Sequence, residues 1–462
     1  MIMHRSAHHL IIAMGLLSAL QTASAKQYVY VLTGQSNSLG AVKGSPATPE
    51  QLERYKSHAR LWNGNMVRDT GVRFEKSPAW QEVRPQLPRY GSLCMGPEYG
   101  FAYMMQKRGW HTGNGDSLCI IKASLDGGGN SFWLPEGKAW KSLTGSLHSA
   151  LSALEGETKV QALLYLQGES DKGDEITHAS ERFLSLHARL GKEVKKGLKL
   201  AVVGECATWK GRDNKDAKGS TTAESMHAMT RTNKNVGWVR TRDLTKITVG
   251  DNMGVHYDGK SQITIGARYA YAVAALEKEH IPSVRSDAAE AALDQPSAWW
   301  NGKRPGPKDV IIWDVAAANC ADALGSGLSV GGLVVEDPFR GRVTISSDNK
   351  RPGRLKLGAD GVKLKGGNLE LHCAVETAAD QVWEVAAGRK LALGSKAAPV
   401  SLSGSGCITL KAPQNAEVEL HLTEAPPQHW KLSTPLPHVH IFIGGRKADF
   451  KAVSEAVYKI AL

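Results

Sequence analysis

The sequence predicts a two-part protein, in which an α/β region with a mostly parallel sheet is followed by a β-rich region. In the first part, short apolar runs without polar alternation are separated by amphipathic stretches of helical length. This rhythm is typical of parallel strands that helices cover on both faces. In the second part, short alternating runs are cut by glycine turns such as "GADG" and "SGSG", which predicts all-β structure.

The α/β region is expected to span residues 26–280. A sheet built in this way places functional side chains at the carboxyl ends of its strands. We expect strands at Tyr28–Leu32, Leu118–Lys122, Ala162–Leu166 and Leu200–Val203, and helices at Tyr99–Lys107, Trp140–Leu154, Ala179–Lys195 and Ile265–Glu277.

The pattern changes after His280. Residues 281–309 are rich in proline and glycine, which predicts a linker. Residues 310–462 predict a β-rich domain, either a sandwich or a short parallel β-solenoid whose rungs stack around one core. Within it, residues 328–393 resemble the autotransporter-type β-strand repeats of exported bacterial proteins. A short helix is expected at Lys451–Lys459.

Residues 1–25 have the three parts of a secretory signal peptide. Basic and histidine residues precede the apolar run Leu10–Leu20, and the small-residue site Ala23-Ser24-Ala25 follows it. The mature chain is therefore expected to begin near Lys26 and to be secreted, periplasmic or held at the cell surface. A retained amino-terminal anchor is the alternative. No later stretch of the sequence is apolar enough for a membrane-spanning helix.

The formal net charge of +12 arises from Lys and Arg scattered along the chain, without a nucleic-acid recognition motif. We therefore expect no nucleic-acid partner. The six cysteines show no CxxC spacing, which argues against a zinc site or thioredoxin chemistry. Cys94 and Cys119 are one candidate disulfide pair, and buried thiols are the alternative. His438 and His440 are expected to be structural, so no metal or cofactor is predicted.

Two polar motifs end apolar runs, "GQSN" at residues 34–37 and "QGESD" at 167–171, and a third, "GVHYDGK" at 254–260, is a glycine-bounded loop before a predicted helix. A strand that ends in Gly-x-Ser can turn sharply and expose both the hydroxyl and the backbone N–H of the serine. Taken alone, Ser36 fits a turn at least as well as a nucleophile. His256, which precedes a predicted helix, gains a role only as the base that takes the proton of Ser36.

In this order, the three motifs resemble the SGNH-type carbohydrate esterases of the sialate O-acetylesterase and acetylxylan esterase group. The resemblance covers about residues 27–280 and includes the blocks "GPEYGFAYMM" and "KASLDGGGNSFW". It implies a flavodoxin-like, three-layer SGNH-hydrolase domain. It also implies a serine esterase that works without a cofactor and removes O-acetyl groups from a carbohydrate, such as a sialate or a xylan-type polysaccharide.

The resemblance implies a role for each matching residue. Ser36 would be the nucleophile and His256 its general base. The oxyanion hole would combine the Ser36 backbone N–H, a backbone N–H from Gly128 or Gly129, and the side-chain amide of Gln167. Losing one such donor typically costs about a hundredfold to a thousandfold in rate.

The carboxylate that would orient the His256 imidazole must come from another position. Met253 occupies the place where many SGNH enzymes have the orienting Asp. Two carboxylates compete for this role. Glu169 is favoured because it lies beside Gln167 at the end of a predicted strand, and Asp251 is the alternative.

Asn37 and Trp133 are the candidate contacts with the acetylated sugar. Trp133 follows the glycine turn and can form an apolar wall, with a core position as the alternative. Two other functions are retained: an inactive carbohydrate-binding or surface-attached protein, and a lipolytic SGNH esterase. The sequence predicts no oligomeric state.

Overall fold

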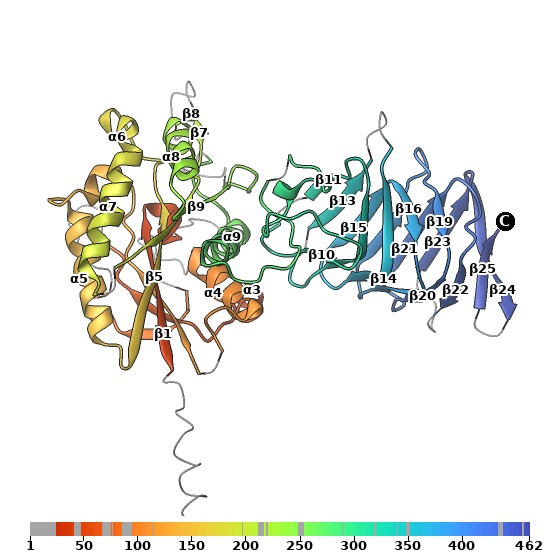
Figure 1. The fold of residues 1–462 in the computed structure, drawn as a ribbon, viewed down its shortest axis with the longest axis horizontal. Helices are drawn as coiled ribbons and strands as arrows, with labels where there is room; N and C mark the ends of the chain where they lie inside the picture. Colours follow the sequence, from red (N-terminus) through yellow and green to blue (C-terminus); the bar gives the residue numbers. More distant parts are fainter. Residues whose placement is uncertain are drawn as a thin grey trace, which may run out of the picture.

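The computed structural model places the two predicted parts side by side (Figure 1). The residues that it describes are 25–40, 48–66, 75, 77–85, 95–113, 115–195, 197–210, 217–218, 220–247, 254–288, 290–317, 320–339, 341–347, 352–432, 438–454 and 457–462.

The first part is built on a seven-stranded sheet in the order β3-β2-β4-β1-β5-β6-β9. All neighbours are parallel except β2 and β3. Taken by chain position, the order β4-β1-β5-β6-β9 is the flavodoxin-like order, with its topological switch between β1 and β5. This confirms the predicted fold class. The strands are β1 (Lys26–Gly34), β2 (Arg60–Asn63), β3 (Trp80–Glu82), β4 (Ser117–Lys122), β5 (Glu157–Leu166), β6 (Leu200–Gly204) and β9 (Val236–Val239).

Helices cover both faces of this sheet, as the sequence predicts. One apolar core lies between the sheet and helices α4 and α9, and a second lies between the sheet and helices α5 and α7. In Figure 1, α4 and α9 lie between the sheet and the second part of the molecule. The helices are α2 (Ser36–Leu39), α3 (Pro49–Arg54), α4 (Pro97–Arg108), α5 (Lys138–Ser152), α6 (Asp174–Thr177), α7 (Ala179–Glu193), α8 (Ser220–Thr232) and α9 (Gly259–Glu277).

The second part is a parallel β-solenoid, one of the two architectures that the sequence predicts. Apart from β16 and β19, which pair with each other beside β14, the strands alternate between two parallel stacks, β10-β12-β14-β17-β20-β22 and β11-β13-β15-β18-β21-β23. Alternate side chains point inward, so aliphatic residues stack from rung to rung; Val343, Leu369, Leu391 and Val418 are consecutive register partners and are all buried.

The bounds of the solenoid strands are β10 (Val310–Trp313), β11 (Cys320–Ala323), β12 (Leu328–Val335), β13 (Arg342–Ser346), β14 (Arg354–Leu364), β15 (Asn368–His372), β16 (Ala374–Thr377), β17 (Gln381–Val385), β18 (Lys390–Leu393), β19 (Leu402–Gly404), β20 (Cys407–Lys411), β21 (Glu417–Leu422), β22 (His429–Leu432) and β23 (His438–Ile443).

The end of the chain differs from the prediction. The short helix expected at Lys451–Lys459 is wrong, because this segment lies in the antiparallel strands β24 (Arg446–Ser454) and β25 (Val457–Ala461). These strands pair with β23 and β22, so they cover the edges that the last rung of the solenoid would otherwise expose.

The segment 281–309, predicted as a linker, contributes to both cores. Val284 packs with the α4 and α9 core, whereas Leu293 and Trp299 pack inside the solenoid. Arg285 pairs with Asp322 at 2.8 Å, and both side chains are 2% exposed. The segment is therefore anchored at the junction rather than solvent-exposed, since its buried polar groups find partners there.

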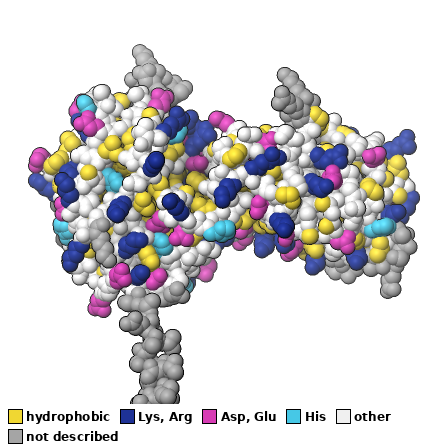
Figure 2. Space-filling view, in the orientation of Figure 1, with side chains coloured by type: hydrophobic (Ala, Val, Ile, Leu, Met, Phe, Trp, Pro, Cys, Tyr) yellow, Lys and Arg dark blue, Asp and Glu magenta, His cyan; other side chains and the backbone are white. Residues whose placement is uncertain are grey.

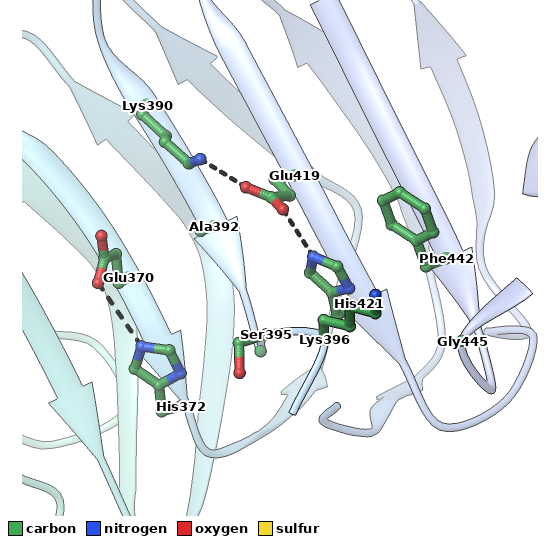
Figure 3. A pocket seen from close by; sticks show the side chains of 11 residues that line it. Glu370, His372, Lys390, Ala392, Ser395, Lys396, Glu419, His421, Phe442 and Gly445 are labelled. Atoms are coloured by element: carbon green, nitrogen blue, oxygen red, sulfur yellow. Dashed lines mark hydrogen bonds and ion pairs between the residues drawn. The ribbon is translucent and has the colours of Figure 1, made fainter. Parts of the chain in front are cut away.

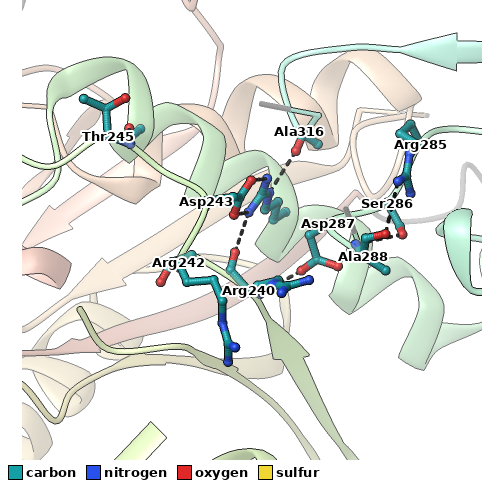
Figure 4. A network of polar contacts seen from close by, with 12 residues as sticks. Arg240, Arg242, Asp243, Thr245, Arg285, Ser286, Asp287, Ala288 and Ala316 are labelled. Atoms are coloured by element: carbon teal, nitrogen blue, oxygen red, sulfur yellow. Dashed lines mark hydrogen bonds and ion pairs between the residues drawn. The ribbon is translucent and has the colours of Figure 1, made fainter. Parts of the chain in front are cut away.

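Polar contacts join the two parts at the face of α4 and α9. Arg108 on α4 donates to Asp314 at 2.8 Å, and the Tyr271 hydroxyl of α9 donates to the same carboxylate at 2.6 Å. Asp314 is fully buried. Beside them, Arg268 holds Asp243 with two hydrogen bonds and donates to the Ala316 carbonyl of the second part at 2.8 Å (Figure 4). The junction is therefore a buried network of charges.

Three other expectations bear on the surface and the thiols. On the face shown in Figure 2, Lys and Arg are spread over both parts of the molecule rather than gathered in one patch. None of the described helices is long and apolar enough to span a membrane.

Cys119 is a free, buried thiol whose Sγ atom lies 3.4 Å from Gln27 Oε1. Of the two alternatives for Cys119, a disulfide with Cys94 or a buried thiol, the structure has the buried thiol. Cys94 lies outside the described residues.

Candidate active site

The candidate nucleophile lies at the switch point of the sheet. Strand β1 ends at Gly34, and Ser36 begins the one-turn helix α2. Gly34 has φ 135°, and a Cβ atom there would lie 1.9 Å from the carbonyl oxygen of Leu166 on β5. Only glycine fits this position, because any side chain would clash with the neighbouring strand. The sharp turn that the sequence predicts therefore exists, and it holds Ser36 at the carboxyl edge of β1.

His256 approaches this serine from the loop before α9. Its Nε2 atom lies 3.0 Å from the Ser36 Oγ atom. Asp258, two residues later, is the N-cap of α9 and accepts from the Ser261 N–H at 2.7 Å, which fixes where the loop ends. The tertiary fold thus brings together two residues that are 220 positions apart in the sequence.

The environment of His256 suits a general base. Burial lowers its pKa from the usual value, and the nearby Asp126 carboxylate acts in the opposite direction. The imidazole is therefore mainly neutral at pH 7, which is the form that can accept the Ser36 proton. Sequence reasoning missed Asp126, although it stands in the "KASLDGGGNSFW" block directly before the glycine turn.

Glu169 is held beside this pair through Asn37. Glu169 Oε1 accepts from Asn37 Nδ2 at 2.7 Å and from the Ala207 N–H at 3.0 Å. Asn37 in turn donates to the Val255 carbonyl at 2.9 Å and accepts from the Tyr257 N–H at 3.2 Å. Asn37 therefore connects Glu169 to the residues on either side of His256.

The contacts of Asn37 bear on its predicted role in sugar binding, and the described range bears on the choice of the carboxylate. Asn37 is fully buried and its amide is used within the protein, so the predicted contact with the sugar is not what the structure favours. Asp251 and Met253 lie outside the described residues. The choice between Glu169 and Asp251 as the carboxylate behind His256 therefore stays a prediction.

The side-chain amide of Gln167, predicted as an oxyanion donor, has acceptors within the protein. Its Nε2 atom is 2.9 Å from the Gly128 carbonyl, 3.1 Å from Gln35 Oε1 and 3.2 Å from Asp171 Oδ1. Gln35 Oε1 also accepts from the backbone N–H of Ser170 at 3.1 Å. An amide has two N–H bonds, and these acceptors already account for both. Gln167 thus ties the loops after β1, β4 and β5 together.

Three backbone N–H groups of the site are available to bind an oxyanion. Among the described residues, no hydrogen-bond acceptor is found for the backbone N–H groups of Ser36, Gly128 and Gly129. A Cβ atom on Gly129 would lie 2.2 Å from the Glu175 carboxylate oxygens, so the turn passes too close to this carboxylate for a side chain. These groups are compatible with the backbone part of the predicted oxyanion hole.

Trp133 lies in the core instead of lining a surface. It is 2% exposed, its ring packs edge-on against Tyr165, and its indole N–H donates to Thr33 Oγ1 at 3.1 Å. The prediction of an apolar wall for the substrate is therefore not supported, because the fold covers the ring and satisfies its donor internally.

A buried ion pair that no sequence motif predicted lies beside helix α2. Lys122 Nζ and Glu98 Oε2 are 2.7 Å apart, and both side chains are fully buried. Lys122 also donates to the carbonyl of Leu39, the last residue of α2, at 2.9 Å. The pair therefore stabilises the turn that carries Ser36. The signal was a lysine at the end of the apolar run "LCIIK" together with the glutamate of "GPEYG".

A cavity of about 490 Å³ lies far from these residues, on the outer face of β15, β18, β21 and β23 (Figure 3). Two Glu-His pairs, Glu370 with His372 and Glu419 with His421, flank the small residues Ala392 and Gly394 of the rung between them. Neither Ser36 nor His256 lines this cavity, so the cavity is separate from the candidate catalytic pair.

Comparison with known proteins assigns the α/β part to a family. The family model "Carbohydrate esterase, sialic acid-specific acetylesterase" matches residues 26–275, which is more than half of the 462 residues. No curated protein matches the chain.

Solved structures similar to this chain include NanS, with 15% identity over 56% of this chain and 99% of that chain and a TM-score of 0.41. XAC1771, a carbohydrate acetylesterase from Xanthomonas citri, shares 15% identity over 55% of this chain and 59% of that chain, with a TM-score of 0.37. A protein from Arabidopsis thaliana shares 16% identity over 53% of this chain and 97% of that chain, with a TM-score of 0.38. The family match shows that the chain belongs to the sialic acid-specific acetylesterase family and is a carbohydrate acetylesterase.

Proposed function

We propose that the protein is an exported serine esterase that removes O-acetyl groups from a sialate or a xylan-type polysaccharide through an acyl-enzyme. The observation that carries this proposal is the 3.0 Å distance between His256 Nε2 and Ser36 Oγ. A neutral imidazole at this distance from a hydroxyl can act as the base that activates it.

In the first half-reaction, Ser36 Oγ attacks the acetyl carbonyl carbon and its proton passes to His256 Nε2. The carbonyl oxygen becomes an oxyanion, which the backbone N–H groups of Ser36 and of Gly128 or Gly129 can receive. When the intermediate collapses, the bond to the sugar oxygen breaks and His256 gives this oxygen its proton.

In the second half-reaction, water attacks the acetyl group on Ser36, and His256 takes one proton from that water. The bond to Ser36 Oγ then breaks, His256 returns the proton to the serine, and acetate leaves. Glu169 holds the residues around His256 through Asn37, and Glu169 and Asp251 remain the two candidates for contact with the imidazole.

The replacement Ser36→Ala tests the proposal. We expect it to abolish hydrolysis of a chromogenic acetate ester and of an acetylated sugar, and to abolish labelling by a fluorophosphonate probe. Ser180→Ala is the matched control, because this hydroxyl contacts Ser225 on α8 and lies outside the site. Full activity of Ser36→Ala would exclude this mechanism, and absence of labelling in the parent protein would favour the inactive carbohydrate-binding alternative.

Export is part of the proposal and has its own test. Strand β1 begins at Lys26, directly after the small-residue site that the sequence predicts to be cleaved. Amino-terminal sequencing of the protein recovered from its native cells should begin near Lys26. An amino terminus that retains residues 1–25 would favour the anchor.

A further inference from the structure

Three potential metal ligands converge at the end of the sheet opposite to Ser36. His111 follows the carboxyl end of α4, Glu277 is the last residue of α9, and Glu279 lies two residues later. The His111 ring stacks on Tyr28 near the start of β1, at 4.0 Å between ring centroids. The cluster is thus separated from the catalytic pair by the length of the strand β1.

The distances within this cluster suit a shared cation better than hydrogen bonds. His111 Nε2 lies 3.5 Å from Glu277 Oε2 and 3.8 Å from Glu279 Oε1, and the ligand atoms all lie within 4.8 Å of one another. An N–H···O hydrogen bond is usually about 2.7–3.2 Å long. Ligands of tetrahedral zinc, each about 2.1 Å from the metal, stand about 3.4 Å apart.

The Glu277 carboxylate gives an independent reason to expect a cation in this cluster. Its side chain is only 9% exposed, and within the described part of the chain neither carboxylate oxygen has a hydrogen-bond partner. The neighbouring cation is Lys159, whose charge acts on both Glu277 and His111 but which forms no ion pair with Glu277 among the described residues. A buried carboxylate in this state costs stability unless a counter-charge reaches it.

The surroundings orient the cluster for binding. The Tyr30 hydroxyl lies 2.7 Å from His111 Nδ1, so the ring is held with Nε2 toward the two carboxylates. His111 at φ 52° and Lys278 at φ 60° are the non-glycine residues with positive φ in the described ranges, and both belong to this corner.

We propose that His111 Nε2, Glu277 Oε2 and Glu279 Oε1 bind a divalent transition-metal cation of the zinc class, with water completing the coordination. Imidazole and carboxylate together favour such an ion over Mg²⁺ or Ca²⁺, which prefer oxygen ligands alone. The cation would join the ends of α4 and α9 at the amino-terminal edge of the sheet. This role is structural and independent of the ester hydrolysis proposed above.

The test uses the full mature chain, stripped with a chelator and then titrated with ZnCl₂. We expect one Zn²⁺ per chain by calorimetry, and a rise in the melting temperature of about 3 °C at a Zn²⁺ concentration about 100 times Kd. MgCl₂ and CaCl₂ at the same concentrations should leave the melting temperature unchanged. An equal response to these ions would overturn the assignment.

Two variants locate the site. Glu277→Gln removes the buried charge at constant size, and His111→Asn keeps a residue type that tolerates a left-handed backbone. Each should weaken Zn²⁺ binding at least about tenfold, with the hydrolysis rate unchanged. His148→Asn is the control, because this exposed histidine pairs with Glu193 at 3.0 Å without a third ligand. Wild-type Zn²⁺ affinity in both cluster variants would contradict the proposal.

Discussion

Glu169 and Asn37 meet at 2.7 Å between Oε1 and Nδ2, directly behind the nucleophile. Because Asn37 follows Ser36 in the chain and also bonds to residues 255 and 257, this contact couples the serine turn to the histidine loop. The geometry of the catalytic pair therefore depends on an amide and a carboxylate that come from two different strand ends.

Glu169→Gln should reveal how this carboxylate acts. A glutamine retains an Oε1 acceptor for Asn37 and for the Ala207 N–H, so a positioning role predicts a loss of only about tenfold in kcat/KM. Glu169→Ala removes the acceptor and should lose more, with a lower melting temperature. A loss near 10⁴-fold in Glu169→Gln would instead identify Glu169 as the carboxylate that orients the imidazole directly.

The pH profile of hydrolysis should reflect the burial of His256. Hydrolysis needs the neutral imidazole, whose fraction rises with pH, and burial lowers its pKa from the usual value. The acidic limb of kcat/KM should therefore lie below pH 6.5. Asp126→Asn removes the charge that raises this pKa, so the limb should move to still lower pH.

Asp174→Asn, at an exposed position of helix α6, is the control for the Asp126 variant and should leave the profile unchanged. A uniform loss of activity in Asp126→Asn without a shift of the limb would mean that Asp126 acts through structure alone.

Gln167→Ala should lower activity and stability together. The side chain links the Gly128 carbonyl to Gln35, so its removal takes away the donor to this carbonyl and loosens the glycine turn. We expect a lower melting temperature and a reduced kcat, whereas Gln414→Ala at an exposed turn of the solenoid should change neither. A loss of 10²–10³-fold in kcat at an unchanged melting temperature would restore the predicted role as an oxyanion donor.

Asp314→Ala should weaken the junction between the α/β part and the solenoid. The replacement leaves the buried Arg108 guanidinium and the Tyr271 hydroxyl without this acceptor, at a cost of about 3 kcal/mol. Thermal unfolding followed by circular dichroism should begin at a lower temperature. Lys107→Ala removes a partly exposed pair with Glu336 and should cost less than about 1 kcal/mol. Equal effects of the two variants would contradict a buried network at this junction.

Local patterns in the sequence were sufficient for the main elements of both parts. The apolar runs of β1, β4, β5 and β6 and the alternating runs of the solenoid are confirmed as strands. A strand that is buried on both faces is apolar along its length, whereas a strand that is buried on one face alternates apolar and polar residues. The final segment was misjudged as a helix because its residues lack a strong period, and only pairing with β22 and β23 defines it as strands.

By itself, the sequence determined the fold class and the ordered motifs that carry Ser36 and His256, since strand ends and turn residues are encoded locally. Only the tertiary structure decided that Asn37 is a buried connector, that Gln167 ties three loops together and that Trp133 belongs to the core. Such roles depend on which polar groups meet across 30 to 220 positions of chain, as with His256 and Ser36, and no local pattern records these distances.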